Sequence, residues 1–149
     1  MSKTVCISTY FSCSEEELWS KIASPKSLQY VAAPILRFVP CRTDSFSDEW
    51  QEGPIYDLNL YLFHVIPLGR HRIKILKADK KANTIVSKES GLFAPVWNHT
   101  ISFHQCGSRE VSYKDRIEIE AGLLTPLICI FARFFYRHRQ RRWKRLLTG

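Results

Sequence analysis

His99 and Asp115 are the two residues of this sequence whose types and positions best suit acid–base chemistry. Each lies in a stretch where large apolar residues recur at every second position, over residues 97–103 and 111–119. This spacing predicts two β-strands and puts His99 and Asp115 on the faces that point into the core. With residues 106–108 as a three-residue turn, His99 lies directly opposite Asp115, and a slip of one step makes the two diagonal neighbours that still reach each other.

Such a pair supports two interpretations. In the first, Asp115 orients the imidazole of His99, which faces a cavity and either holds a polar group of a ligand or acts as a general base. In the second, the pair is a buried hydrogen bond that satisfies both side chains and lets Asp115 stay ionised. No nucleophile or further catalytic group stands at an informative spacing, so we favour the structural interpretation and keep His99 and Asp115 as candidate catalytic residues.

Aromatic residues are frequent in the predicted strands and in the C-terminal segment. On a concave sheet they either line a pocket or fill the core, and the residues alone leave both interpretations open. A pocket would have a volume of roughly several hundred Å³, with walls that include Trp97, Phe103, Tyr113 and Phe131. The expected ligand-binding residues are Tyr56, Trp97, His99, Phe103, Tyr113, Asp115, Phe131 and Phe135.

Positive charge is concentrated near the end of the chain. Residues 133–145 contain seven Lys or Arg and no acid, whereas the other residues hold 15 basic and 14 acidic side chains. The run suits a solvated helix C-terminus, which favours cations, and this is the interpretation that we favour. The alternative is contact with anionic lipid headgroups or a partner through Arg137, Arg141, Arg142, Lys144 and Arg145, with Trp143, Leu146 and Leu147 reaching the membrane interface. Nucleic-acid binding is disfavoured, since a second basic surface is lacking.

The elements that position these residues follow from local patterns. A strand is expected over Lys3–Phe11, followed by a short helix capped by Ser14 with Glu17 at its third position, and by a second one that begins at Ser24-Pro25. Five further strands precede the last one, Glu110–Ile119, without an intervening helix, so the sheet should be antiparallel. They are Ile35–Val39, Tyr56–Phe63, His71–Ala78, Ile85–Glu89 and Trp97–His104, and Pro67-Leu68-Gly69 is expected to break the chain between the second and the third.

A long helix should follow the last strand, from Thr125-Pro126 to about Leu147. Its apolar run, residues 121–132, is too short to cross a bilayer. The residues that share its predicted buried face are Leu124, Leu127, Phe131, Phe134, Phe135 and His138, whereas Arg133, Arg137 and Arg141 fall on the opposite side.

Length and composition bound the remaining possibilities. We expect residues 1–149 to form a single domain, because this is a common domain size. The five cysteines form no C-x-x-C pair and no metal-ligand spacing with histidine, so we predict neither a metal site nor a cofactor. The N-terminus lacks the apolar core of a signal peptide, and together with the odd number of cysteines this favours the reducing cytoplasm.

The order of elements and two short motifs resemble the helix-grip fold of the START-like, polyketide-cyclase (SRPBCC) superfamily. Trp97-Asn98-His99 and Tyr113-Lys114-Asp115-Arg116-Ile117 are similar to a W-x-H … D-x-I pattern before the last helix, and Trp50-Gln51-Glu52-Gly53 resembles the family's segment before the third strand. The resemblance implies an α+β fold, a curved antiparallel sheet of 6–7 strands around the long C-terminal helix, with two short helices after the first strand. It also implies a hollow that binds lipids, polyketides or other apolar molecules.

We therefore expect this protein to bind a hydrophobic small molecule, for transport or sensing. The alternative is an enzyme of the aromatase/cyclase or hydratase type that uses His99 and Asp115. The third hypothesis is contact with an anionic membrane or a partner through the basic helix end.

Overall fold

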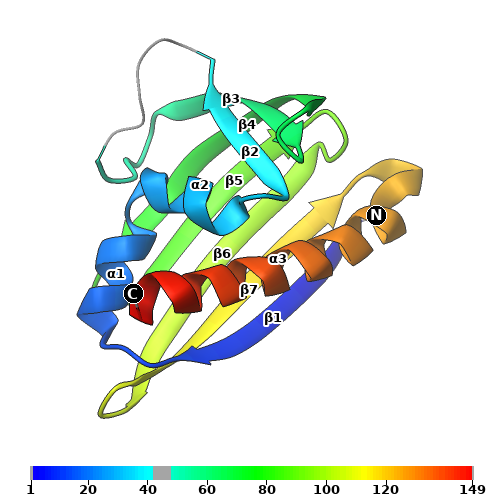
Figure 1. Cartoon of the computed structure of the whole chain (residues 1–149). Helices are drawn as coiled ribbons and strands as arrows, with labels where there is room; N and C mark the ends of the chain where they lie inside the picture. The colour runs from blue at the N-terminus through cyan, green and yellow to red at the C-terminus, as the bar shows by residue number, and fades with distance from the viewer. Residues whose placement is uncertain (1, 42–47, 149) are drawn as a thin grey trace.

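One seven-stranded antiparallel sheet curves around a long helix in the computed structural model, which describes residues 2–41 and 48–148 (Figure 1). The strand order across the sheet is β1-β7-β6-β5-β4-β3-β2. The strands are β1 (Lys3–Phe11), β2 (Leu36–Pro40), β3 (Ile55–Leu62), β4 (Ile66–Asp79), β5 (Thr84–Gly91), β6 (Val96–Gly107) and β7 (Glu110–Glu120). This architecture confirms the helix-grip fold that the sequence predicted.

The helices also lie where the sequence predicted them. They are α1 (Glu15–Ile22), α2 (Pro25–Ala32), a short 3-10 turn η1 (Gly122–Leu124) and α3 (Thr125–Thr148). The Ser14 side chain caps α1 by accepting a hydrogen bond of 3.1 Å from the backbone N–H of Glu17, whereas Ser24 caps α2 without a side-chain bond. α3 runs across the concave side of the sheet, and α1 and α2 lie beside its C-terminal half (Figure 1).

The concave face of the sheet, which lies toward α3, is lined by alternate, mostly apolar residues of the strands. β7 shows this most clearly, since Val111, Tyr113, Asp115, Ile117 and Ile119 are all buried and the residues between them face outward. The same alternation in β4 to β6 builds the opposite half of the inner face.

One predicted chain break is wrong, because β4 already begins at Ile66. The chain reverses before it, where Phe63 and His64 adopt positive φ angles. The pairing then skips Leu68, since Leu60 lies opposite Gly69 and Tyr61 opposite Pro67. A β-bulge thus absorbs the proline and the glycine, so the strand bends instead of ending.

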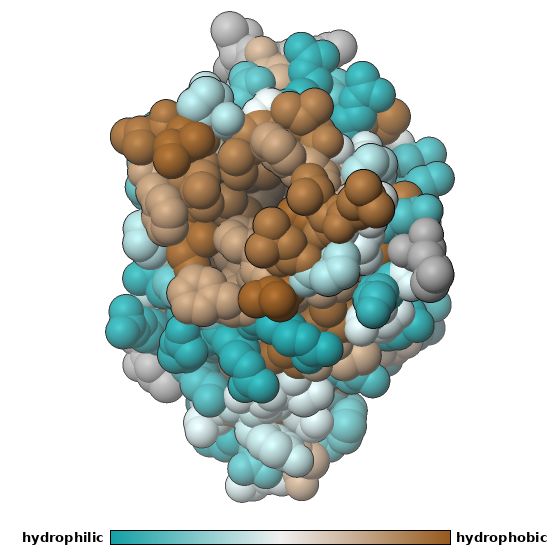
Figure 2. All heavy atoms as spheres, turned by 90° about the vertical axis from the view of Figure 1, so that its right-hand side faces the viewer, coloured by the Kyte–Doolittle hydropathy of each residue, from teal (hydrophilic) through white to brown (hydrophobic). Residues whose placement is uncertain are grey.

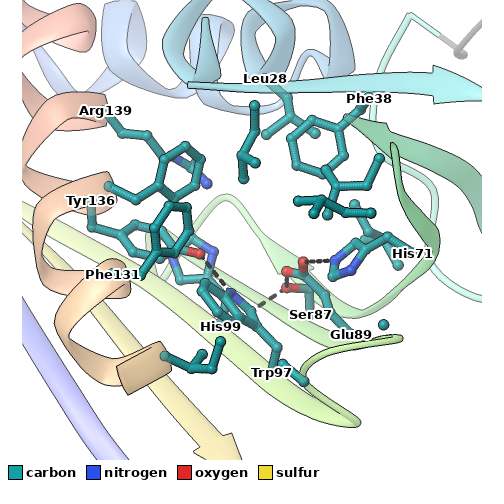
Figure 3. A pocket seen from close by; sticks show the side chains of 18 of the residues that line it. Leu28, Phe38, His71, Ser87, Glu89, Trp97, His99, Phe131, Tyr136 and Arg139 are labelled. Atoms are coloured by element: carbon teal, nitrogen blue, oxygen red, sulfur yellow. Dashed lines mark hydrogen bonds and ion pairs between the residues drawn. The ribbon is translucent and has the colours of Figure 1, made fainter. Parts of the chain in front are cut away.

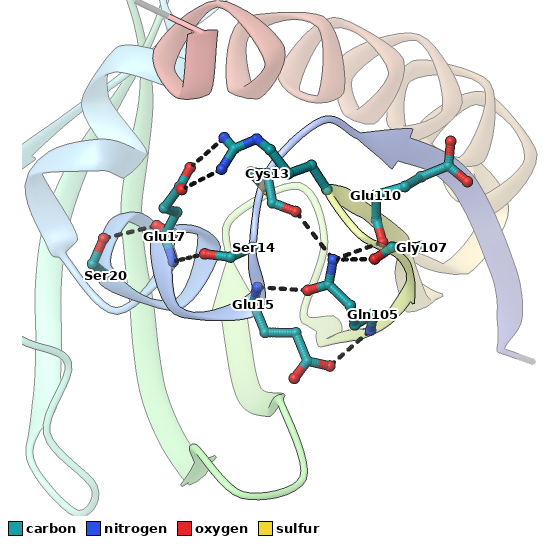
Figure 4. A network of polar contacts seen from close by, with 9 residues as sticks. Cys13, Ser14, Glu15, Glu17, Ser20, Gln105, Gly107 and Glu110 are labelled. Carbon is teal, nitrogen blue, oxygen red and sulfur yellow. Dashed lines mark hydrogen bonds and ion pairs between the residues drawn. The ribbon is translucent and has the colours of Figure 1, made fainter.

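The turn between β6 and β7 also differs from the prediction. Gln105 pairs with Val111 and Gly107 with Glu110, which leaves Cys106 as a bulge beside a two-residue turn. Gln105 fixes this geometry, because its side-chain nitrogen donates to the Gly107 carbonyl at 2.7 Å and its side-chain oxygen accepts from the backbone N–H of Glu15 at 3.0 Å (Figure 4). The start of α1 is therefore tied to the end of the hairpin.

The buried face of α3 is rotated from the predicted one. Leu127 and Phe134, expected in the core, are 62% and 58% exposed. The core-facing residues include Ala132, Tyr136 and Trp143. The reason is tertiary, because the first half of α3 does not press against a closed sheet but borders the opening of a cavity.

Candidate ligand-binding cavity

A cavity of about 690 Å³ lies between the inner face of the sheet and α3. Its wall is mainly apolar and includes Phe38, Ile73, Ile85, Ile101 and Phe131. The strand residues reach it because they occupy the inward positions of β2, β4, β5 and β6. This volume lies within the range of about 300–1,000 Å³ that is usual for small-molecule sites.

The cavity opens to solvent through an apolar mouth. Five residues both line the cavity and are exposed, and they come from the loop after β5 and from the first half of α3. They are Leu92, Phe93, Leu127, Ile130 and Phe134. Figure 2 shows this surface, where hydrophobic side chains surround a hollow. Exposed apolar side chains gathered at one opening usually mark a binding or membrane-contact site.

A polar cluster inside the cavity joins β4 and β5 (Figure 3). The carboxylate of Glu89 lies 2.9 Å from Nε2 of His71 and accepts a hydrogen bond of 2.6 Å from the Ser87 hydroxyl. Burial raises the pKa of Glu89, but the hydrogen bond and charge of His71 outweigh it, and the net pKa lies below the ordinary value. A Cβ atom at Gly91 would come within 2.8 Å of Nδ1 of His71, so the glycine leaves room for this ring.

This cluster was not predicted from the sequence. The signal was present, since His71 is spaced by two residues from Ile73 and by four from Ile75, and Ser87 and Glu89 follow Ile85 at the same two-residue spacing. The same two-residue period that singled out His99 therefore puts all three polar residues on the inner face.

His99 and Asp115 form the buried pair that the sequence predicted, but in a different register. His99 lies opposite Ile117, whereas Asp115 lies opposite Ile101. The pairing is shifted by two residues from the direct alignment, because of the bulge at Cys106, so both side chains keep their inward orientation and meet diagonally. Nε2 of His99 lies 2.7 Å from Oδ1 of Asp115.

Asp115 is fully buried and accepts two further hydrogen bonds. The Tyr113 hydroxyl donates to Oδ1 at 2.9 Å, and the Gln140 side chain donates to Oδ2 at 3.0 Å. Burial raises the pKa of Asp115, but the hydrogen bond and charge of His99, then the charge of Arg139, hold the net pKa below the ordinary value. Asp115 therefore stays ionised behind His99, which itself lines the cavity.

Four of the eight predicted ligand-binding residues line the cavity: Trp97, His99, Phe131 and Phe135. Trp97 donates a hydrogen bond of 2.9 Å from its indole nitrogen to the hydroxyl of Tyr136, which also lines the cavity. The rings of Phe131 and Phe135 stack at 5.7 Å. Their contact with a ligand remains a prediction.

The other four, Tyr56, Phe103, Tyr113 and Asp115, are not among the lining residues, so the expected walls at Phe103 and Tyr113 are corrected. Phe103 packs on Trp19 of α1 with ring centroids 6.5 Å apart. Tyr113 packs on Phe11 at 4.8 Å. Both face inward as predicted, but the N-terminal helices and β1 fill that end of the sheet.

Arg139 is the unexpected member of the site. The sequence grouped it with a solvated basic run, yet its side chain is 6% exposed and lines the cavity. Its guanidinium lies over the Tyr136 ring at 4.9 Å, and its Nε atom has no hydrogen-bond partner among the described residues. Figure 3 shows the side chain directed from α3 into the cavity.

The basic helix end is also less available than predicted. Trp143, which the membrane alternative put at the interface, is 2% exposed and lines the cavity. Arg142 stacks on the Tyr30 ring at 4.0 Å and donates to the Tyr30 carbonyl at 3.0 Å. Arg137 and Arg141 are exposed, as are Lys144 and Arg145. Lipid or partner contact by these residues remains a prediction.

Within residues 2–41 and 48–148, no cluster of three His, Cys, Asp or Glu side chains has the arrangement to hold a metal ion. None of the helices there is long and apolar enough to cross a membrane.

A family model described as "Domain of unknown function (DUF8410)" matches residues 9–147. Comparison with curated proteins finds no match in sequence. Among solved structures, a Chromobacterium violaceum protein is similar with a TM-score of 0.75 and 13% identity, covering 98% of this chain and 97% of its own.

Two further solved structures that are similar to this chain belong to proteins with a stated family or activity. A START superfamily protein from Mycobacterium smegmatis has a TM-score of 0.71 and 12% identity, with 97% of each chain covered. Norcoclaurine synthase from Thalictrum flavum, in complex with dopamine and hydroxybenzaldehyde, has a TM-score of 0.69 and 13% identity, covering 99% of this chain and 87% of its own. At these identities the likeness establishes the fold, which is the START-like helix-grip fold.

Proposed function

We propose that this chain, which belongs to the DUF8410 family of domains, binds a hydrophobic small molecule in the cavity between its sheet and α3, for transport or sensing. The observation that carries the proposal is the cavity itself. Its volume of about 690 Å³ lies in the range usual for small-molecule sites, about 300–1,000 Å³. The apolar wall favours an apolar occupant.

Native mass spectrometry of the purified chain tests this proposal, together with displacement of a neutral apolar dye such as Nile red. We expect the dye to bind with one site per chain and to be displaced by long-chain alcohols. Absence of saturable dye binding by the folded protein would contradict the proposal.

A second candidate function is general-base catalysis by His99. The observation in its favour is that Asp115 occupies Nε2 of His99, whereas Nδ1 has no hydrogen-bond partner among the described residues. Since Asp115 is held ionised, it fixes the proton on Nε2 and leaves Nδ1 to accept a proton from a bound substrate. The folds of this chain and of norcoclaurine synthase are alike, which makes an enzyme of this architecture a reasonable alternative.

Proton exchange tests this alternative without the natural substrate. An apolar ketone that binds in the cavity would exchange its α-protons with deuterated water faster than in buffer, as followed by NMR. The exchange should disappear in His99→Gln. Equal exchange in both proteins would assign the pair a structural role only.

The apolar mouth is a candidate surface for membrane contact. Leu127, Ile130 and Phe134 project from α3 at the opening, and α3 also carries the exposed Arg133 and Arg137 but no acidic residue. Apolar side chains beside cations suit the surface of an anionic bilayer. We therefore propose the mouth, more than the helix end around Trp143, as the surface that contacts a membrane, where it would give an apolar ligand a dry path into the cavity.

A further inference from the structure

Arg139 is a buried cation for which residues 2–41 and 48–148 provide no hydrogen-bonding partner. A guanidinium stays ionised in proteins and has five N–H donors to satisfy. Taking such a group out of water is costly unless it is paired and hydrogen-bonded. Among the described residues, Arg139 has only the faces of Tyr136 and Phe135, at 4.9 Å and 5.9 Å from its central carbon, and no carboxylate forms an ion pair with it.

The nearby acids are already engaged elsewhere. Asp115 accepts from His99, Tyr113 and Gln140, and Glu89 is bonded to His71 and Ser87. Their charges attract Arg139 through the protein, but they do not satisfy its donors. The site therefore combines a cation with unused donors and a cavity that its side chain lines.

We infer that Arg139 binds a carboxylate of the ligand, so that the molecule in the cavity is apolar and ends in a single acidic group. This inference rests on the proposed function and names the ligand class. The planar fork of arginine matches a carboxylate in a bidentate geometry. A doubly charged phosphate is disfavoured, because the ionised Glu89 and Asp115 lie in the same region.

The position of Arg139 also orients the ligand. The mouth residues Leu127, Ile130 and Phe134 precede Arg139 on α3 by about 18, 14 and 8 Å along the helix axis. Arg139 thus lies toward the deep end, beside Trp143, whereas the mouth is apolar. The acid enters first, and the hydrocarbon extends along α3 toward Leu127 and Ile130.

Competitive displacement of Nile red by dodecanoate, dodecanol and dodecyl phosphate tests the inference. At neutral pH, the wild type should bind dodecanoate about tenfold or more tightly than dodecanol, as a charge-assisted hydrogen bond provides. Dodecyl phosphate should bind less tightly than dodecanoate. Arg139→Met should bring the ratio of dodecanoate to dodecanol affinity to one or below. Arg116→Met, which removes an exposed cation from β7, is the matched control and should keep the wild-type ratio.

These measurements distinguish a folding defect of the variant from a failure of the Arg139 inference. Arg139→Met loses no hydrogen bond to a described residue but gives up the attraction of Asp115 and Glu89, so its melting temperature is measured beside its binding. If it does not fold, Arg139→Gln serves as the neutral variant. Equal binding of dodecanoate and dodecanol by the wild type overturns the Arg139 inference alone. An unchanged affinity ratio in the neutral variant also overturns the inference. Arg139 would then only balance the negative charges of Asp115 and Glu89. If no dodecyl compound displaces the dye, the proposed function fails as well.

Discussion

Nε2 of His99 lies 2.7 Å from Oδ1 of Asp115, although the two residues are not partners in the β6–β7 ladder. The pair closes diagonally, because His99 lies opposite Ile117 and Asp115 opposite Ile101. This diagonal contact links the cavity wall to a carboxylate that is fully buried behind it. It explains how a protein with an apolar cavity keeps an ionised acid in its core.

Asp115→Asn should lower the free energy of unfolding by about 1–3 kcal/mol at neutral pH, because it disturbs a buried group with three hydrogen-bond donors around it. The folded-state pKa of Asp115 is depressed, so its contribution is fully present above its unfolded pKa of about 4 and is lost as the pH falls through the folded value. Denaturant unfolding of both proteins between neutral and acidic pH measures this. The difference between them should shrink in acid.

Asp57→Asn is the control for that experiment, since Asp57 forms a partly exposed ion pair with Arg72 at 3.1 Å. Surface pairs of this kind contribute little, so its effect should be small at every pH. An Asp115→Asn protein as stable as the wild type at neutral pH would contradict the buried network.

Replacing an isoleucine by a larger residue should have different effects at a cavity-lining position and at a core position. Ile101 lines the cavity, whereas Ile117 is fully buried and does not. Ile101→Phe should extend into empty space, change stability little and weaken binding of Nile red. Ile117→Phe should overpack the core and cost about 1–3 kcal/mol, with dye affinity retained in the folded protein. Denaturant unfolding and dye titration give both readouts, and equal stability losses would count against an empty cavity.

Trp143 should behave as a core residue and not as a membrane anchor. Trp143→Ala should lower the free energy of unfolding by about 3–5 kcal/mol, the usual cost of truncating a buried aromatic side chain. Trp143→Phe should cost much less, because the indole N–H has no partner among the described residues. Chemical denaturation measures both. A Trp143→Ala protein of unchanged stability would return this residue to the surface.

The apolar mouth should govern vesicle binding. Replacing Leu127 and Ile130 by serine should lower the affinity for vesicles of mixed phosphatidylglycerol and phosphatidylcholine by about tenfold or more, since apolar area no longer enters the interface. Added salt should weaken the wild-type binding. Co-sedimentation provides the measurement. Leu76→Ser, an exposed change on β4 away from the cavity, is the control; an equal loss there would exclude a specific role of the mouth.

The order of elements and the inward orientation of the pair could be read from the sequence. Strand periodicity is local, so the faces of residues 97–103 and 111–119 were readable, and Ser14 and Glu17 marked the start of α1. The inward faces also survive the corrected register, because a shift of two residues preserves which side of the sheet a side chain occupies.

Which inward residues line the cavity and which pack in the core depends on tertiary packing. Phe103 and Tyr113 follow the same alternation as Trp97, yet Trp19 and Phe11 fill the space beside them. Arg139 shows the opposite case: it lies in a basic run that the sequence predicts to be solvated, but packing of α3 on the sheet buries it. The orientation of α3 on the sheet places Arg139 inside and Leu127 outside. This orientation depends on packing between segments that are far apart in the chain.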